Sequence, residues 1–415
     1  MKFACIHGHF YQPPRENPWT GRIDRQPTAA PWPDWNHRIT AECYRPSGRA
    51  KLLGEDGDVR RRLSTWEHIS FDVGPTLSSW LERHAPDVHE TIVRADRASA
   101  ARLGHGNAIA QGCHHAILPL ASEADKEREV ERGIEDFVAR FGRDPEGLWL
   151  PETAVDTATL VALAAAGIGF TILAPGQCRE MRSAGGEWGP LVPGMPARVA
   201  LPGGRDIVVF FYDGPVSQGV AFEGLLHDGE DYANHLMQAP GFAMAATDGE
   251  SYGHHHRHGE MALARCIEVL EGRDDVALSN PAAWMAANEV RHEALLVLPS
   301  SWSCAHGVGR WSRDCGCALA GPANGRWRGE LRAALNALRD DLGEVDGALL
   351  DCRLKMFTSC GWFFDAPGIE AIQILRYALR AIELSGREDL EEPFVERLGS
   401  LGSLWRDEVR SILLG

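Results

Sequence analysis

Two acidic side chains stand where the sequence could carry out nucleophilic or acid–base chemistry. Glu152 lies in "GLWLPETAVD" and Asp248 in "ATDGESYGHHH". Each follows a short apolar run, so each is expected at the end of a strand. Cleavage of a glycosidic bond needs such a pair, one carboxyl to protonate the leaving oxygen and one to attack the sugar or activate water. A purely structural role is the alternative, in which Glu152 is a solvated turn residue and Asp248 caps the next helix.

Polar side chains end other apolar runs as well. Together with the two carboxylates they form four clusters, after "FACI", "GNAIAQ", "GLWLP" and "GFAMAA". In a parallel α/β barrel, reactive side chains gather at the carboxyl ends of the strands, so we expect these clusters to meet. These clusters contain the polar side chains of His7, His9, Gln12, His114, His115, Glu250 and His254, which are candidates for the site.

The histidines also allow a metal-dependent interpretation. With Asp248, His7 and His9 could ligate Zn²⁺ or Fe²⁺, as in metal-dependent carbohydrate deacetylases. None of the spacings forms a tight ligand pattern such as H-E-x-x-H, so we favour a site without a metal or other cofactor. A third hypothesis is a non-catalytic carbohydrate-binding protein that has kept the cleft.

A separate cluster of sulfur and imidazole side chains lies in "SSWSCAHGVGRWSRDCGC". Cys304, His306, Cys315 and Cys317 could form a structural zinc set. The C-x-H and C-x-C spacings are not those of common zinc ribbons, so we favour buried free thiols. Because the segment follows a strand-like run, "EALLVLPS", His306 could instead reach the cleft and contact the substrate.

Seven apolar runs supply the elements that must position these residues: "FACIH", "HISFDV", "GNAIAQ", "GLWLP", "GFTILA", "DIVVFFY" and "GFAMAAT". Helical patterns lie between several of them, which predicts parallel strands with crossover helices, in a barrel or an open sheet. A count of seven favours the barrel. Helical periodicity dominates after about residue 325. We therefore predict an α/β barrel over residues 1–325 and a helical region over residues 326–415, packed together without a flexible linker.

Composition restricts the partners. The net charge of −16 leaves no basic surplus for binding a nucleic-acid backbone. No apolar run approaches the roughly 18 residues of a membrane helix, and the first residues do not resemble a signal peptide. The 10 cysteines lie mostly in apolar segments, as reduced thiols do in cytoplasmic proteins. We expect a cytoplasmic protein with neither a nucleic-acid nor a membrane partner; the oligomeric state is not predicted.

The four clusters together resemble the motifs of glycoside hydrolase family 57. The matching stretches are "HGHFYQP", "GCHHAILPL", "GLWLPE" and "TDGESYGHH", and "TSCGWFFD" is similar to a fifth motif. The resemblance covers residues 3 to about 365. It implies an incomplete (β/α)7 barrel followed by a helical domain, and a retaining mechanism on α-glycosidic bonds without a catalytic metal. "HGHFYQPPRENPW" departs from the "H-x-Q-P" typical of the amylases and branching enzymes, which leaves the sugar undefined.

The resemblance also implies roles for individual residues. Glu152 would be the nucleophile and Asp248 the general acid/base of a hydrolase or transglycosylase acting on α-linked, glucan-type oligo- or polysaccharides. His7, His9 and His115 would bind the sugar next to the nucleophile. Further contacts with the substrate would come from Glu250 and His254 of the fourth motif, and from Gln12 and His114. The apolar walls of the cleft would be Trp149 and Trp362.

Overall fold

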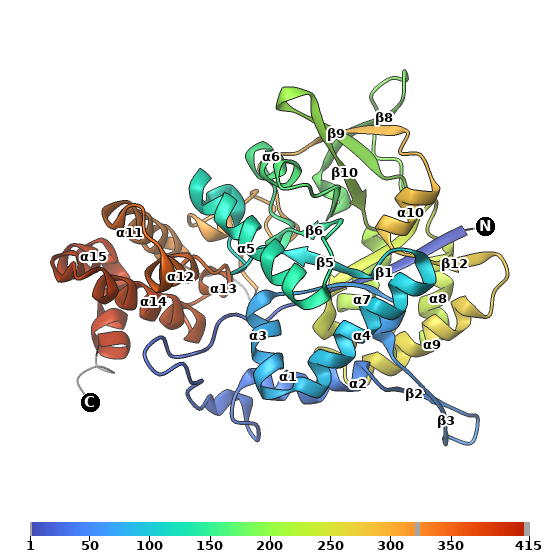
Figure 1. Cartoon of the computed structure of the whole chain (residues 1–415), viewed down its shortest axis with the longest axis horizontal. Helices are drawn as coiled ribbons and strands as arrows, with labels where there is room; N and C mark the ends of the chain where they lie inside the picture. Colours follow the sequence, from blue (N-terminus) through green and yellow to red (C-terminus); the bar gives the residue numbers. More distant parts are fainter. Residues whose placement is uncertain (1, 320–323, 411–415) are drawn as a thin grey trace.

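The computed structural model describes residues 2–319 and 324–410. An α/β part and a C-terminal group of helices lie side by side, with the helices at one end of the long axis (Figure 1). Within the described residues, no helix combines the length and the apolar character needed to cross a membrane.

Seven parallel strands form the centre of the α/β part. They are β1 (Lys2–Phe10), β4 (Ser70–Val73), β5 (Ala108–Gln111), β6 (Leu148–Trp149), β7 (Phe170–Leu173), β10 (Arg205–Phe211) and β11 (Ala243–Asp248). The order β11-β1-β4-β5-β6 forms one sheet, and β7 pairs with β10 in another. A parallel bridge between Gly147 and Phe170 joins β6 to β7. After β10, the Asp213 N–H donates to Met244 O of β11 at 2.6 Å.

These strands are the seven apolar runs seen in the sequence, and the incomplete (β/α)7 barrel is confirmed. Their residues are almost all buried, as expected for parallel strands covered on both faces. The helices around them are α3 (Pro75–His84), α4 (Pro86–Leu103), α5 (Glu123–Phe141), α6 (Thr157–Ala165), α7 (Gly214–Phe222), α8 (Gly229–Gln238), α9 (Gly259–Glu271) and α10 (Pro281–Ala287).

Two insertions extend the barrel. The first runs between β1 and β4 and contains α1 (Trp35–Ile39), α2 (Arg45–Ser47), β2 (Ala50–Leu53) and β3 (Val59–Leu63). The second lies between β7 and β10 and contains β8 (Cys178–Ser183) and β9 (Ala197–Leu201), of which β9 pairs with β10. The strand β13 (His292–Leu296), which follows α10 in the chain, lies between β9 and β8 and is antiparallel to β8. The short strand β12 (Val276–Leu278) pairs with the start of β1.

The C-terminal region is helical, as predicted. It consists of α11 (Arg326–Leu342), α12 (Gly347–Lys355), α13 (Cys360–Phe363), α14 (Ile369–Ser385), α15 (Glu391–Arg397) and α16 (Gly402–Leu404). Its apolar core includes Ala116, Ile117 and Ala154 of the barrel, together with Val308 and Trp311 from the segment before α11. A continuous core therefore joins the two parts.

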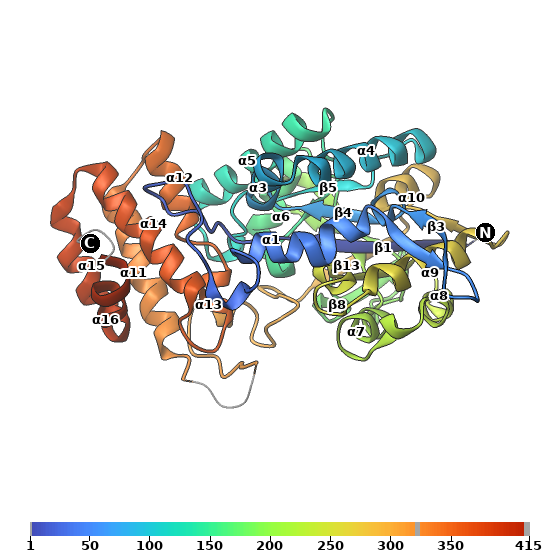
Figure 2. The same ribbon diagram turned by 90° about the horizontal axis from the view of Figure 1, so that it is seen from below.

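The first insertion also contacts the helical region (Figure 2). The Trp19 indole N–H donates to Glu383 Oε2 at 2.6 Å, and the Tyr377 hydroxyl donates to Glu16 O at 3.1 Å. A buried ion pair joins Arg353 of α12 to Asp125 of α5 at 2.6 Å. The helical region is thus attached to the barrel through polar contacts as well as the shared core.

Candidate active site

Three strand ends lie next to one another at the mouth of the barrel. His9 of β1 is in register with Asp248 of β11 on one side and with Asp72 of β4 on the other. Because all three strands are parallel, their carboxyl ends open at the same end of the barrel. The sheet register therefore brings an imidazole between two carboxylates.

Glu152 lies on a sharp turn just after β6. Its backbone is left-handed, with φ 57°, and Thr153 follows with φ 49°. Such conformations cost non-glycine residues of the order of 1–3 kcal/mol, so the surroundings must hold them. Gln177 holds the turn at Thr153. Its Oε1 accepts from Thr153 Oγ1 at 2.8 Å, and its Nε2 donates to Thr153 O at 2.8 Å and to Ser300 Oγ at 3.0 Å.

The carboxylate of Glu152 is held by one of its two oxygens. Oε2 accepts from the indole Nε1–H of Trp302 at 2.9 Å and from Ser303 Oγ at 2.6 Å. The backbone N–H of Trp302 also donates to Glu152 O at 3.1 Å. Within residues 2–319 and 324–410, no donor contacts Oε1. One oxygen is thus fixed and the other is open to a reacting atom.

Asp248 differs from Glu152 in its exposure and, among the described residues, in its lack of fixed hydrogen bonds. Its side chain is exposed at the end of β11, and it makes no cap hydrogen bond to the short 3₁₀ helix that follows, Gly249–Tyr252. In the described part of the chain no donor is fixed to its carboxylate. The helix-cap interpretation therefore has no support, whereas Asp156 does cap α6, accepting from Thr159 N–H at 2.7 Å.

Burial shifts the pKa of two glutamates at the mouth. It raises the pKa of Glu152 above its usual range, and the nearby charge of Asp248 adds to the rise, while hydrogen bonds from Ser303 and Trp302 oppose it. Burial also raises the pKa of Glu250 to about 7. The Tyr44 hydroxyl opposes this rise, because it donates a hydrogen bond to Glu250 Oε1 at 2.5 Å. A site with one group that can hold a proton near neutral pH is suited to acid–base chemistry.

Asp72 links the two histidines of β1. Its Oδ1 lies 3.1 Å from His7 Nε2, and its Oδ2 lies 2.8 Å from His9 Nδ1. Burial disfavours the charged form of His9, but Asp72, with Asp248 and Glu250, outweighs burial and raises the pKa of His9 to about 9. Burial lowers the pKa of His7 despite Asp72. His9 is thus the cation of the site at neutral pH.

This charge fixes the protons on the neighbouring ring. His9 Nε2 lies 3.1 Å from His115 Nε2, and His115 Nδ1 lies 2.6 Å from Ser359 Oγ. A charged His9 donates from both nitrogens, so His115 must accept at Nε2 and carry its proton on Nδ1. Burial and the charge of His9 lower the pKa of His115 far below its usual range, consistent with that assignment. Tyr11 stacks on His115 with ring centroids 3.7 Å apart.

The same contacts bear on the metal-dependent interpretation. Both ring nitrogens of His7 are engaged, by Ser70 Oγ at 2.9 Å and by Asp72. Those of His9 are engaged by Asp72 and His115. His7, His9 and Asp248 therefore offer no convergent set of free ligand atoms. Among the described residues, the side chains whose ligand atoms do converge are Cys304, His306, Cys315 and Cys317.

Gln12, Glu250 and His254 line the side of the mouth formed by the first insertion. Gln12 Nε2 donates to the Tyr44 hydroxyl at 3.3 Å, and that hydroxyl in turn donates to Glu250. His254 Nδ1 lies 2.6 Å from Glu42 Oε2. The predicted residues Gln12 and Glu250 are thus joined through Tyr44, whereas His254 is held on the insertion.

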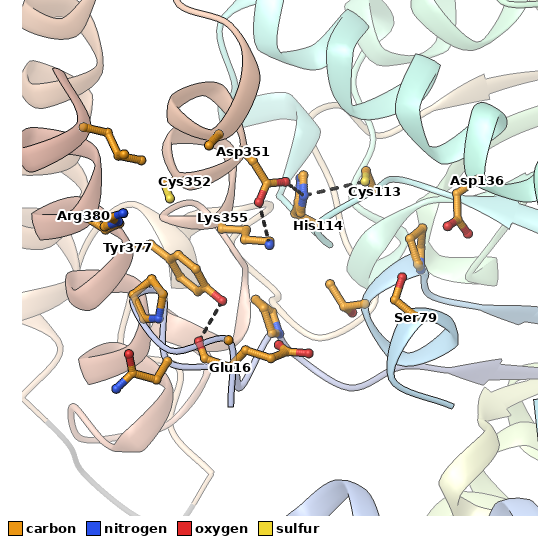
Figure 3. Close-up of a pocket in the computed structure, with 18 of the residues that line it drawn as sticks. Glu16, Ser79, Cys113, His114, Asp136, Asp351, Cys352, Lys355, Tyr377 and Arg380 are labelled. Atoms are coloured by element: carbon orange, nitrogen blue, oxygen red, sulfur yellow. Dashed lines mark hydrogen bonds and ion pairs between the residues drawn. The ribbon is translucent and has the colours of Figure 1, made fainter. Parts of the chain in front are cut away.

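His114 points away from its neighbour His115. Its Nδ1 lies 2.7 Å from Glu129 Oε1, and its Nε2 lies 3.3 Å from Asp351 Oδ1 of α12. It lines a cavity of about 410 Å³ between the barrel and the helical region, with Lys355 and Tyr377 (Figure 3). Neither Glu152 nor Asp248 lines that cavity. The structure therefore separates His114 from the predicted sugar-binding histidines.

The remaining predicted residues occupy three different places. Trp149 is fully buried and stacks on His7 and His9, with ring centroids 4.9 and 5.1 Å apart. Trp362 is also fully buried; its indole N–H donates to Arg328 O at 3.1 Å, so its ring is not open to a sugar. The His306 Nδ1 contacts Cys317 Sγ at 3.3 Å.

Several residues at the mouth were not among the sequence candidates. Asp72 could have been found, because it is the second-last residue of "HISFDV" and so lies close to a strand end, as Asp248 does. Trp302 and Ser303 could not, since they lie in a loop brought to Glu152 by long-range pairing of Val155 with Ser300. Further such residues are Tyr11, Tyr44, Gln177 and Ser359.

Comparison with known proteins shows the family to which the chain belongs. The family model described as "Glycosyl hydrolase family 57" matches residues 69–299. A second model, described as a domain of unknown function (DUF3536), matches residues 348–404. Among curated proteins, Alpha-amylase 1 of Dictyoglomus thermophilum is 26% identical over 113 residues, which are 26% of this chain and 16% of that protein. The chain thus matches only a small part of that relative.

Solved structures share the fold at low sequence identity. An exo-type maltose-forming amylase from Pyrococcus sp. ST04 has a TM-score of 0.70 at 15% identity, over 98% of this chain and 83% of that chain. A GH57-type branching enzyme from Pyrococcus horikoshii has a TM-score of 0.63 at 16% identity, over 96% and 94%. A 4-alpha-glucanotransferase from Thermococcus litoralis also reaches 0.63 at 15% identity, over 93% and 60%.

Proposed function

The chain belongs to glycosyl hydrolase family 57, and on that premise we propose that it cleaves or transfers α-linked glucosyl units with net retention of configuration. Glu152 is the nucleophile of this proposal and Asp248 its general acid/base. The substrate is an oligo- or polysaccharide of the α-glucan type. The amylase, branching-enzyme and glucanotransferase activities in the names of similar proteins support this choice of substrate.

The reaction follows two displacements. Glu152 Oε1 attacks the anomeric carbon while Asp248 gives its proton to the leaving oxygen, which breaks the glycosidic bond and forms a glycosyl ester. Asp248 then takes a proton from water or from a sugar hydroxyl, whose oxygen attacks the anomeric carbon and releases Glu152. Two inversions at one carbon return the α configuration. Water as acceptor gives hydrolysis, and a sugar hydroxyl gives transfer.

One observation carries the proposal: Glu152 is fixed through Oε2 by Trp302 and Ser303, while Oε1 has no donor among the described residues. The strained turn and the clamp by Gln177 serve a side chain that must point in one direction. His9 supplies positive charge that favours the carboxylate form of Glu152. A solvated turn residue would need none of these contacts.

The test measures both turnover and stereochemistry. Maltooligosaccharides are incubated with the wild type, and the anomer formed first is read by NMR; we expect the α anomer. Glu152→Ala should abolish turnover. With an α-glucosyl fluoride and added azide, the same variant should form the β-glucosyl azide, because azide then makes a single displacement from the vacated face.

Asp248→Ala is the matched control for the azide experiment. Its nucleophile is intact, so azide should enter in the second displacement and give the α-glucosyl azide. Full activity of Glu152→Ala on a substrate that the wild type turns over would contradict the nucleophile assignment. Binding of maltooligosaccharides without turnover by the wild type would favour the non-catalytic hypothesis.

We also propose a reducing, cytoplasmic location for this enzyme. All ten cysteines are unpaired in the structure, and five of them are buried, so disulfides contribute nothing to the fold described. Fractionation of the native cells with detection of the chain checks this, and recovery outside the cytoplasm would contradict it.

A further inference from the structure

We propose that Cys304, His306, Cys315 and Cys317 bind one zinc ion in a tetrahedral structural site. Their four ligand atoms, three Sγ and one imidazole nitrogen, all lie within 4.8 Å of one another. The sequence alone favoured free thiols here, because the C-x-H and C-x-C spacings are uncommon. The structure reverses that preference, since it brings the two short pairs together at one point.

The distances between the ligand atoms fit a zinc ion at their centre. Zinc bonds to sulfur of about 2.3 Å in a tetrahedron place two sulfurs about 3.8 Å apart. Cys304 Sγ lies 3.8 Å from Cys317 Sγ and 3.9 Å from Cys315 Sγ. His306 Nδ1 lies 3.3 Å from Cys317 Sγ, near the roughly 3.6 Å expected for a nitrogen and a sulfur ligand.

The backbone is shaped for this convergence. Gly316 separates Cys315 from Cys317 with φ 78°, a left-handed conformation that turns both thiols to the same side. A Cβ on Gly309 would lie 2.9 Å from the Cβ of Cys315, so the close approach of these segments requires glycine there. Both features bring the second pair of ligands against the first.

The charges around the cluster also suit this ion. Three thiolates on Zn²⁺ leave one net negative charge, and the fully buried guanidinium of Arg328 lies beside the cluster, donating to Cys317 O at 3.2 Å. The nearby Arg310 is also buried and donates to Ser303 O at 3.3 Å. A Cys₃His set selects zinc over harder cations such as Mg²⁺, which prefer oxygen ligands. Binding releases the thiol protons to solvent and involves no redox step.

The site has a consequence for the mouth of the barrel. Cys304 directly follows Ser303 and Trp302, the two side chains that hold Glu152 Oε2. A metal at Cys304 would fix the end of the loop that presents these donors. This positioning role rests on the proposed function, whereas the metal site itself does not.

The test is the metal content of the purified full-length chain, prepared under reducing conditions, equilibrated with Zn²⁺ and freed of loose metal. Mass spectrometry should find one zinc per chain. The Cys315→Ser/Cys317→Ser variant should lose it. Cys178→Ser, which changes a half-buried cysteine of β8 outside the cluster, should keep it.

A spectroscopic measurement keeps the proposal testable if the double variant fails to fold. Cobalt exchanged into the wild type should show thiolate-to-metal charge-transfer absorption and the intense visible bands of tetrahedral coordination. Absence of stoichiometric zinc, retention of zinc by the folded double variant, or a disulfide between two of the three cysteines in reduced preparations would each overturn the proposal. None of these results depends on enzymatic activity.

Discussion

Trp302 holds Glu152 at two points, since its indole N–H donates to Glu152 Oε2 at 2.9 Å and its backbone N–H donates to Glu152 O at 3.1 Å. The first bond stabilises the carboxylate and the second stabilises the left-handed turn that carries it. A residue from the loop after β13 thus favours the ionised form of the proposed nucleophile and helps to fix its direction.

Trp302→Phe should weaken the proposed nucleophile without removing it. Loss of a hydrogen bond to a charged group costs about 1.5–3 kcal/mol, so kcat/KM should fall roughly 10- to 100-fold. The lost donor opposed the rise in the pKa of Glu152, so the acidic limb of the pH profile should move to higher pH. Trp284→Phe, in the apolar cluster with Phe210 and Phe242, is the control and should leave that limb in place. An unmoved limb in Trp302→Phe would contradict the role of the indole.

Asp72→Asn should lower the pKa of His9 from about 9. Burial alone disfavours the imidazolium, and the charge of Asp72 is the largest of the effects that oppose burial. Titration of the His9 ring by NMR measures this directly. Asp248→Asn should lower the same pKa by less, because Asp248 makes a smaller contribution. Equal shifts in the two variants would show that Asp72 does not set the charge of His9.

Glu250→Gln should make the stability of the protein less dependent on pH. The pKa of Glu250 is about 7 in the folded protein and 4.5 ordinarily, so the folded state holds the extra proton between these values. Its contribution to stability is therefore complete below about pH 4.5 and is lost as the pH rises through about 7. Thermal unfolding at about pH 5 and about pH 8 should show a smaller difference for the variant than for the wild type. An unchanged difference would refute the raised pKa.

Arg353→Met should destabilise the attachment of the helical region to the barrel. It leaves Asp125 buried without its partner, which costs about 3–5 kcal/mol. Arg397→Met removes an ion pair with Asp341 in which the side chains are 43% and 39% exposed, and should cost at most about 1 kcal/mol. Chemical denaturation of both variants checks the contrast, and equal losses would count against a structural role for the buried pair.

The barrel could be predicted from the sequence because its strands are nearly continuous apolar runs. All seven runs became parallel strands, and parallel strands place their end residues together, which is why His9 and Asp248 could be expected at the same end of the barrel. Their direct pairing in register could not be predicted. β8, "CREMRS", was missed because most of its residues are polar or only partly buried and it is stabilised by pairing with β13. The β-propensity of its residues does not indicate that they form a strand, because the strand depends on its partner.

The rest of the site depends on contacts that local sequence does not encode. Trp302 is brought to Glu152 by the pairing of Ser300 with Val155, which lies 145 positions earlier in the chain. His114 and His115 are neighbours in the chain, yet one faces Asp351 and the other faces His9. The left-handed backbone of His115, φ 57°, separates them, and nothing in "GCHHAIL" indicates such a conformation for a histidine.

Trapping the glycosyl ester on Glu152 would test directly whether this side chain is the nucleophile. The wild type is treated with a fluorinated α-glucosyl fluoride that forms the ester quickly and releases it slowly, digested, and its peptides are analysed by mass spectrometry. We expect one added fluoroglucosyl unit per chain, located on Glu152 and absent when maltooligosaccharide protects the site. A label on Glu250 or Asp248, or a stable unlabelled Glu152 in an enzyme that turns over α-glucans, would contradict this assignment.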